Sequence, residues 1–165
     1  MKKLVADYAR YNLWANERII STLKEMDTSL IDKDLGSSFP SIRQTLLHIW
    51  DVETLWLQRL KGENPTAFPS KTFTGSHEDI YEGLIAASRA FIKHIEEVPA
   101  TAFTHVVAFK TFSYGEAKEQ IYNIMHHCLN HSAHHRGQLV TMMRQCGVTK
   151  FPPLDFIFYR QEKNK

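Results

Sequence analysis

The sequence predicts an all-α protein, a four-helix bundle with a small β-hairpin between its third and fourth helices. Two observations support this fold class. Four long stretches place apolar residues three and four positions apart, which is the spacing of a helix with one buried face. Between the third and fourth stretches, residues 102–114 are instead rich in β-branched and aromatic residues, as in a pair of short strands.

The first two helices have recognisable boundaries. The second is expected to begin at Ser41, which forms an S-x-x-Q capping box with Gln44, and to end at Leu60 or Lys61 before a Gly-Glu-Asn-Pro turn. The first is expected over about residues 2–26, because its apolar residues share one face. That face consists of Leu4, Tyr8, Tyr11, Ala15, Ile19 and Met26.

The third helix and the hairpin follow. Ser76, with Asp79 three residues later, predicts the start of a helix that runs to Val98 before a proline. The hairpin is then expected within residues 102–114, with its turn near Lys110.

The fourth helix and the tail complete the chain. Ser113 and Glu116 form a further capping box, and the helix they open is expected to stop before Gly147. The segment 151–159 is too apolar to remain in solvent, so we expect it to pack over the bundle. No repeat or linker indicates a second unit, and residues 1–165 are expected to form a single domain.

Composition excludes several classes of function. The net charge is +2 without any run of Lys or Arg, so nothing favours nucleic-acid binding. No apolar run reaches the roughly 18 residues of a membrane span, and the first residues lead into an amphipathic helix rather than a signal peptide. Cys128 and Cys146 would lie about 27 Å apart on one helix and could not form a disulfide. We therefore expect a cytoplasmic protein.

The strongest functional signal is a histidine pair on the fourth helix. His131 and His135 are one helical turn apart, and His135 falls within the apolar stripe while His131 lies at its edge. Two imidazoles on one face can bind one metal ion, although a buried histidine can also be satisfied by a carbonyl or hydroxyl group. A catalytic site needs a third ligand. His48, at the border of the second helix's apolar arc, is the candidate, and a partly buried, hydrogen-bonded histidine is the alternative.

Other polar residues are candidates for supporting roles. Asn12 and Glu53 fall within the apolar stripes of their helices, so each needs a buried partner. Glu53 is expected to bond to a polar group of the first helix such as Asn12, or alternatively to orient a ligand imidazole. Gln138 shares a flank with His131 and could contact a substrate, and His127 is a candidate for the rim of the site. Arg136 is expected to face away.

The motifs together resemble the DinB/YfiT-like family of four-helix-bundle proteins, whose members are regarded as metalloenzymes. The resemblance extends over essentially the whole chain. It rests on residues 11–18, 39–49 and 131–139, with a C-terminal segment at 152–156. It implies a divalent metal ion held by His48, His131 and His135, and an up-down-down-up bundle that is usually dimeric.

The resemblance also sets an expected chemistry. Three imidazoles would leave at least one position on the ion open, as in catalytic zinc sites. Relatives include transferases and isomerases that use low-molecular-weight thiols, so the expected reaction joins a thiol to a small electrophilic substrate at Zn²⁺ or Ni²⁺, or is hydrolase-like with a bound water. The alternative is a metal-binding, damage-inducible protein that acts through a partner without turnover.

A homodimer is also expected from the sequence. Trp14 lies off the main stripe of the first helix, and Trp50 and Leu57 lie to one side of the second helix's stripe. Apolar groups beyond one core face can mark a second buried surface, and two-fold pairing is the commonest way to cover it. The alternative is that the tail or the hairpin covers these side chains.

Overall fold

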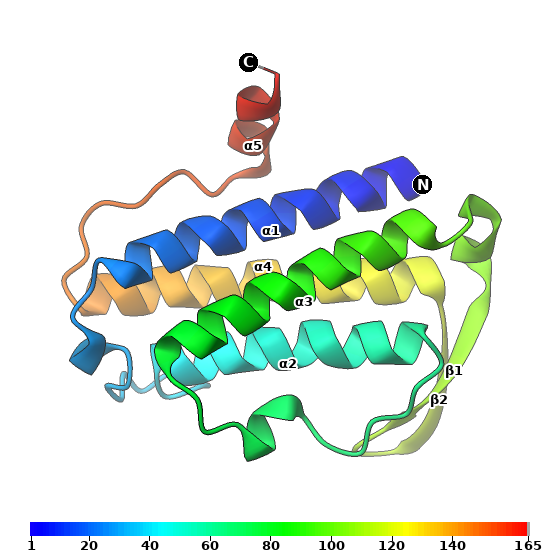
Figure 1. Cartoon of the computed structure of the whole chain (residues 1–165), viewed down its shortest axis with the longest axis horizontal. Helices are drawn as coiled ribbons and strands as arrows, with labels where there is room; N and C mark the ends of the chain where they lie inside the picture. The colour runs from blue at the N-terminus through cyan, green and yellow to red at the C-terminus, as the bar shows by residue number, and fades with distance from the viewer. Residues whose placement is uncertain (165) are drawn as a thin grey trace.

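Four long helices run side by side and form the body of the molecule (Figure 1). The computed structural model describes residues 1–164 of the chain. α1 and α4 run in one direction and α2 and α3 in the other, which confirms the up-down-down-up bundle (Figure 1). α1 and α2 each pack against both α3 and α4, so α2 faces α4 directly. The helices are α1 (Lys2–Lys24), α2 (Ile42–Leu60), α3 (His77–Glu97) and α4 (Ile121–Gln145).

The predicted starts of α2 and α3 are confirmed. Ser41 Oγ accepts a hydrogen bond of 3.2 Å from the backbone N–H of Gln44. At α3 the box is complete, because Ser76 Oγ accepts from the N–H of Asp79 and the Asp79 carboxylate accepts from the N–H of Ser76. These bonds satisfy N–H groups that have no partner within the first turn of a helix.

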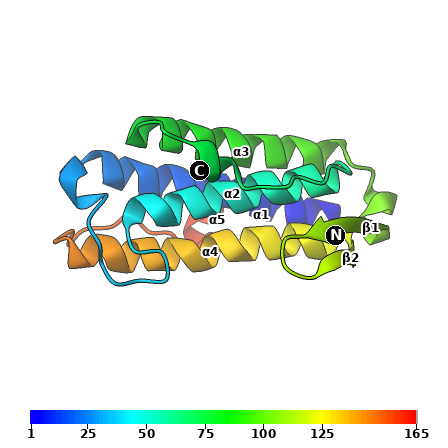
Figure 2. The same cartoon turned by 90° about the horizontal axis from the view of Figure 1, so that it is seen from below.

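The β-hairpin lies at one end of the bundle, beside the end of α2 and the start of α4 (Figure 2). β1 (Val106–Thr111) pairs antiparallel with β2 (Gly115–Gln120). The turn therefore occupies residues 112–114 and not the neighbourhood of Lys110. Gly115 ends this loop with a φ of +83°, a left-handed conformation that glycine adopts without strain and that is common after three-residue hairpin loops.

The predicted start of the fourth helix is wrong. Ser113 lies in the hairpin turn, and Glu116 is paired with Lys110 across the two strands, so these residues form no capping box. α4 begins only at Ile121, after Gln120. The second strand has few residues of high β-propensity, but pairing along the whole of β1 satisfies its backbone, and this tertiary context outweighs the local preference.

The tail packs back over the bundle, as predicted. It ends in a short helix, α5 (Phe156–Lys163), which lies against α1 (Figure 1). Tyr159 is buried, with its ring 6.0 Å from that of Tyr11 and 5.7 Å from that of Trp14. The indole N–H of Trp14 donates to the Glu162 carboxylate at 2.9 Å. Trp14 is therefore covered within the chain.

Trp50 and Leu57 are also accounted for within the chain. The Trp50 ring packs edge-on to Phe73 at 5.2 Å and lies against Gly83, where any Cβ would come within 2.5 Å of the indole. Leu57 is buried in the core. The three side chains thus give the predicted homodimer no support, and the dimer stays a prediction.

Two predictions drawn from composition concern the membrane and the cysteines. None of the helices within residues 1–164 combines the length and the apolar character needed to cross a membrane. Cys128 and Cys146 are both free thiols, and Cys128 is fully buried among apolar side chains of the core.

The interior contains two apolar clusters with a polar layer between them. One cluster lies towards the α4 C-terminus and the other towards the hairpin. Along each long helix, the buried polar residues lie between the residues of one apolar cluster and those of the other. The polar layer consists of Asn12, Asn16, Glu53, Ser88, Ser132 and Arg136, all 3% exposed or less.

Glu53 is the acceptor at the centre of this layer. Its carboxylate, on α2, accepts hydrogen bonds from Asn12 on α1 at 2.7 Å, from Ser88 on α3 at 2.6 Å and from Ser132 on α4 at 2.9 Å. The amide of Asn16 also donates to it, at 3.3 Å. All four long helices are therefore joined at one carboxylate. The predicted bonding of Glu53 to polar groups of the first helix is confirmed.

Arg136 completes the layer from α4. Its guanidinium donates to the side-chain oxygens of Asn12 and Asn16, so the two asparagines connect the buried cation to the Glu53 carboxylate. Arg136 was expected to face away from His131 and to serve packing or the dimer, and its hydrogen bonds are to α1 and not to the imidazoles. Its burial is tolerated because an opposite charge and hydrogen-bond acceptors are close.

Replacing Glu53 should destabilise the protein strongly. We expect Glu53→Ala to lower the free energy of unfolding by about 3 kcal/mol or more, because four donors lose their common acceptor and the buried Arg136 cation loses its nearby negative charge. Urea unfolding followed by circular dichroism measures the change. The matched control is Glu17→Ala, a partly exposed carboxylate paired with Arg89, which should change stability by no more than about 0.5 kcal/mol. Equal effects in the two variants would contradict the central role of Glu53.

Candidate metal centre

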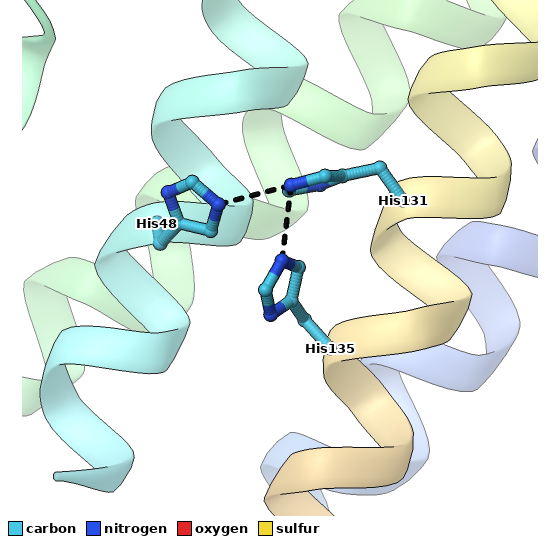
Figure 3. Close-up of side chains that lie close together, drawn as sticks. All are labelled: His48, His131 and His135. Carbon is cyan, nitrogen blue, oxygen red and sulfur yellow. Dashed lines mark hydrogen bonds between the residues drawn. The ribbon is translucent and has the colours of Figure 1, made fainter. Parts of the chain in front are cut away.

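Three imidazole rings converge between α2 and α4 (Figure 3). His48 comes from α2, and His131 and His135 come from successive turns of α4. The Nε2 atom of His131 lies 2.9 Å from Nε2 of His48 and 3.0 Å from Nε2 of His135. Among the described residues, these three form the only group of His, Cys, Asp or Glu whose ligand atoms all lie within 4.8 Å of one another.

The spacing of these nitrogens suits a single metal ion. Two nitrogens bound to one tetrahedral zinc ion at about 2.05 Å lie roughly 3.3 Å apart. Two of the observed separations, 2.9 and 3.0 Å, are close to this value, and the ligand atoms of the third pair, His48 and His135, lie within 4.8 Å of each other.

Hydrogen bonding at the rings also fits a bound cation. Nδ1 of His135 donates to the side-chain oxygen of Gln138 at 2.7 Å, which leaves a lone pair on Nε2 of His135 directed at His131. If Nε2 of His131 carries a hydrogen, it can donate to the lone pair of His135. The same nitrogen then has no lone pair to accept a hydrogen bond from Nε2 of His48. Mutual hydrogen bonds therefore leave one contact unsatisfied, whereas one cation would bind all three lone pairs.

Burial favours the neutral, ligand form of the imidazoles. It lowers the pKa of His48 to about 4, with His135 as a second cause, and the pKa of His131 to about 3, with the other histidines adding to the effect. Burial also lowers the pKa of His135, although the hydrogen bond to Gln138 opposes the shift. Metal binding requires neutral imidazole, so the site needs no deprotonation near neutral pH.

Phe39 holds two of the rings in place. Its ring stacks on that of His48 at 4.1 Å between centroids and packs edge-on to that of His135 at 5.6 Å. Sequence reasoning assigned Phe39 no role. The available signal is its place two residues ahead of the Ser41 cap, where the chain enters α2.

The other sequence candidates lie at different distances from the rings. Gln138 is in direct contact with His135, as described above. His127 is exposed, and its ring centroid lies 6.1 Å from that of His131, which places it at the rim. Asn12 and Glu53 belong to the polar layer, and the structure does not bring them to the imidazoles. Glu53 acts on this region only through Ser132, the residue next to His131.

The histidine cluster is bordered by two cavities. One, of about 400 Å³, is lined by His134 and Gln138. The other, of about 240 Å³, lies between α2 and the hairpin, and His131 forms part of its wall together with aromatic side chains such as Trp56 and Phe109. A small molecule in the second cavity could therefore reach the cluster.

The fold and the three histidines define a helical-bundle protein with a candidate metal centre built from facing helices. The sequence model of the DinB family matches residues 1–164, and the chain belongs to this family. Protein DinB of Bacillus subtilis strain 168 is 24% identical over 149 residues, which cover 86% of each protein. The crystal structure of a DinB-like protein from Bacillus cereus ATCC 10987 shares the fold, with a TM-score of 0.66 at 19% identity, covering 84% of this chain and 89% of that one.

Metal content should depend on the three histidines. We expect one divalent ion per chain in the wild-type protein and nearly none in His135→Ala, because two remaining imidazoles are a poor site for a transition metal. Elemental analysis of protein purified in the presence of zinc measures the content. His126→Ala is the matched control, since His126 is exposed on the same helix and should leave the content unchanged. Near-full metal in His135→Ala would rule out the three-histidine site.

Removing the metal should leave the bundle folded. The two apolar clusters form without the histidines, so the ion adds stability by linkage, about 2.7 kcal/mol when it is present at 100 times its Kd. A chelator should lower the melting temperature of the wild-type protein while the far-UV circular dichroism stays helical. The same chelator should not affect His135→Ala. A random-coil spectrum after chelation would indicate a metal-dependent fold instead.

Proposed function

We propose that this protein is a divalent-metal-dependent enzyme that transfers a low-molecular-weight thiol to a small electrophile. One observation carries the proposal. Three neutral imidazoles converge beside a cavity, and no carboxylate or cysteine of the described residues joins them. A three-histidine set leaves coordination positions free, which distinguishes catalytic from structural zinc sites.

The residues around the cluster have roles that follow from their contacts. Gln138 fixes the ring of His135 and the position of its free lone pair. Phe39 covers His48 and His135 with an apolar ring and keeps water from that side. When bound, the ion would supply Lewis acidity, which favours the thiolate form of a thiol or the hydroxide form of water near neutral pH.

Zinc and nickel are the proposed metals. Imidazole nitrogen is a good ligand for both ions, and binding of a soft thiol sulfur is typical of zinc. If water replaces the thiol, the same site would perform hydrolysis, which is the closest alternative within this class.

A non-catalytic role is the alternative from a different class. A damage-inducible protein that binds metal and acts through a partner would need the same three histidines but no turnover. The cavity beside His131 favours an enzyme, because a protein that only stores or senses an ion has no need of space for a second molecule. A homodimer and a cytoplasmic location remain parts of the proposal.

Turnover should require the metal centre. We expect zinc-loaded wild-type protein to accelerate the reaction of a low-molecular-weight thiol with monobromobimane, and His135→Ala to lose on the order of 100-fold or more of that acceleration. Bimane fluorescence measures the rate. His126→Ala should keep the wild-type rate. Retention of metal without any acceleration by zinc- or nickel-loaded protein would favour the non-catalytic alternative.

A further inference from the structure

A buried arginine shares a cavity wall with His131, and no carboxylate within residues 1–164 forms a salt bridge with it. Arg59, near the end of α2, is only 4% exposed. It lines the same 240 Å³ cavity as His131. Every side chain that lines this cavity is apolar, aromatic, hydroxylic or basic, so no carboxylate of the described residues faces the guanidinium there.

The hydrogen bonds of Arg59 are incomplete. Its Nη2 donates to the backbone carbonyl of Lys110 at 2.8 Å, which ties α2 to the hairpin. Its Nε is buried and has no partner among the described residues. An unpaired buried donor on a charged group is costly, and a bound anionic ligand is one way to satisfy it where the group lines a cavity. Consistently, burial lowers the pKa of Arg59, and the opposing effect comes from the Tyr114 phenol and not from a carboxylate.

The surroundings of Arg59 differ from those of the other deeply buried arginine. Arg136 also has a buried nitrogen without a partner among residues 1–164, Nη2, but its Nη1 bonds to two asparagines that connect it to the Glu53 carboxylate. Arg59 instead lies among aromatic rings, with its Cζ 4.6 Å from the ring centroid of Trp56 and 4.9 Å from that of Phe109. Ring faces stabilise a cation, but they provide no acceptor in the plane of the guanidinium for its N–H groups.

We propose that the cavity between α2 and the hairpin binds the carboxylate of a small, planar, apolar electrophilic substrate, and that Arg59 is the residue that binds this carboxylate. The proposal rests on the proposed function for the role of the ligand as electrophile. A carboxylate can accept from two N–H groups of one guanidinium, which would satisfy Nε. The aromatic walls suit a planar body. His131 on the same wall places the other end of the ligand beside the imidazole cluster.

Ligand binding to the metal-free protein tests this assignment separately from catalysis. The probes are benzoate, its neutral counterpart benzamide, and 3-mercaptopropionate as a carboxylate that carries a thiol. Calorimetry should show that wild-type protein prefers benzoate to benzamide, with and without zinc. Arg59→Met should weaken benzoate binding by on the order of tenfold or more, because a cation that pairs with a desolvated carboxylate is lost. Arg59→Lys, which keeps the charge without the planar fork, should be intermediate.

The matched control is Arg89→Met, an exposed arginine on α3 paired with Glu17, which should bind benzoate like the wild type. The metal content of Arg59→Met should equal that of the wild type, so failure of the metal site and failure of the carboxylate site give different results. If Arg59→Met does not fold, the Nε–Hε resonance of Arg59 in the wild-type protein decides, since benzoate should shift it downfield and benzamide should not.

Three binding results, and one spectroscopic result, would overturn the proposal. The first is an equal affinity of the wild type for benzoate and benzamide. The second is that the wild type loses benzoate binding when zinc is removed while zinc-loaded Arg59→Met keeps it. This result would place the carboxylate on the metal. The third is binding of 3-mercaptopropionate, but not benzoate, that depends on Arg59, because the cavity would then belong to the thiol. An unchanged Nε–Hε resonance at saturating benzoate would count equally against it.

Discussion

The positions of the four long helices depend on one buried carboxylate. Glu53 accepts hydrogen bonds from side chains of α1, α3 and α4, and a buried acceptor of this kind tolerates little displacement of its donors. Apolar contacts above and below the polar layer are numerous but less directional, so they allow a helix to slide or rotate more easily. The polar layer thus fixes which residues of neighbouring helices lie at the same level.

This constraint reaches the candidate metal centre through α4. Ser132 and Arg136 are one turn apart and bond to the layer, while His131 and His135 are one turn apart on the adjacent strip of the same helix. The hydrogen bonds of Ser132 and Arg136 therefore fix the position of α4 along its axis and its rotation about that axis. This in turn sets where His131 and His135 lie relative to His48 on α2. A rigid element that carries two ligands needs only one facing helix to complete a three-histidine site.

The electrostatics of the site follow from what surrounds it. The three imidazoles are neutral near pH 7 because burial disfavours their charged forms, and no acidic side chain lines the cavity beside His131. A bound divalent ion would therefore carry its charge into a region that already contains the buried Arg59 cation. Such a region favours anionic ligands and disfavours cationic ones, which agrees with the carboxylate ligand proposed for Arg59.

The sequence by itself determined the all-α bundle, the starts of α2 and α3 and the buried state of Glu53, because these depend on helical periodicity and on local capping. Periodicity also singled out the pair His131 and His135, whereas the complete set with His48 followed from the family resemblance. The tertiary structure decided the length of the second strand, the burial of Arg136 and the covering of Trp14 by α5. It also decided the contacts of Phe39 and Arg59. A helical wheel shows the direction of a side chain within one helix, but the partner that makes burial of a charge or a ring favourable comes from a distant segment. Only the packed structure identifies that partner.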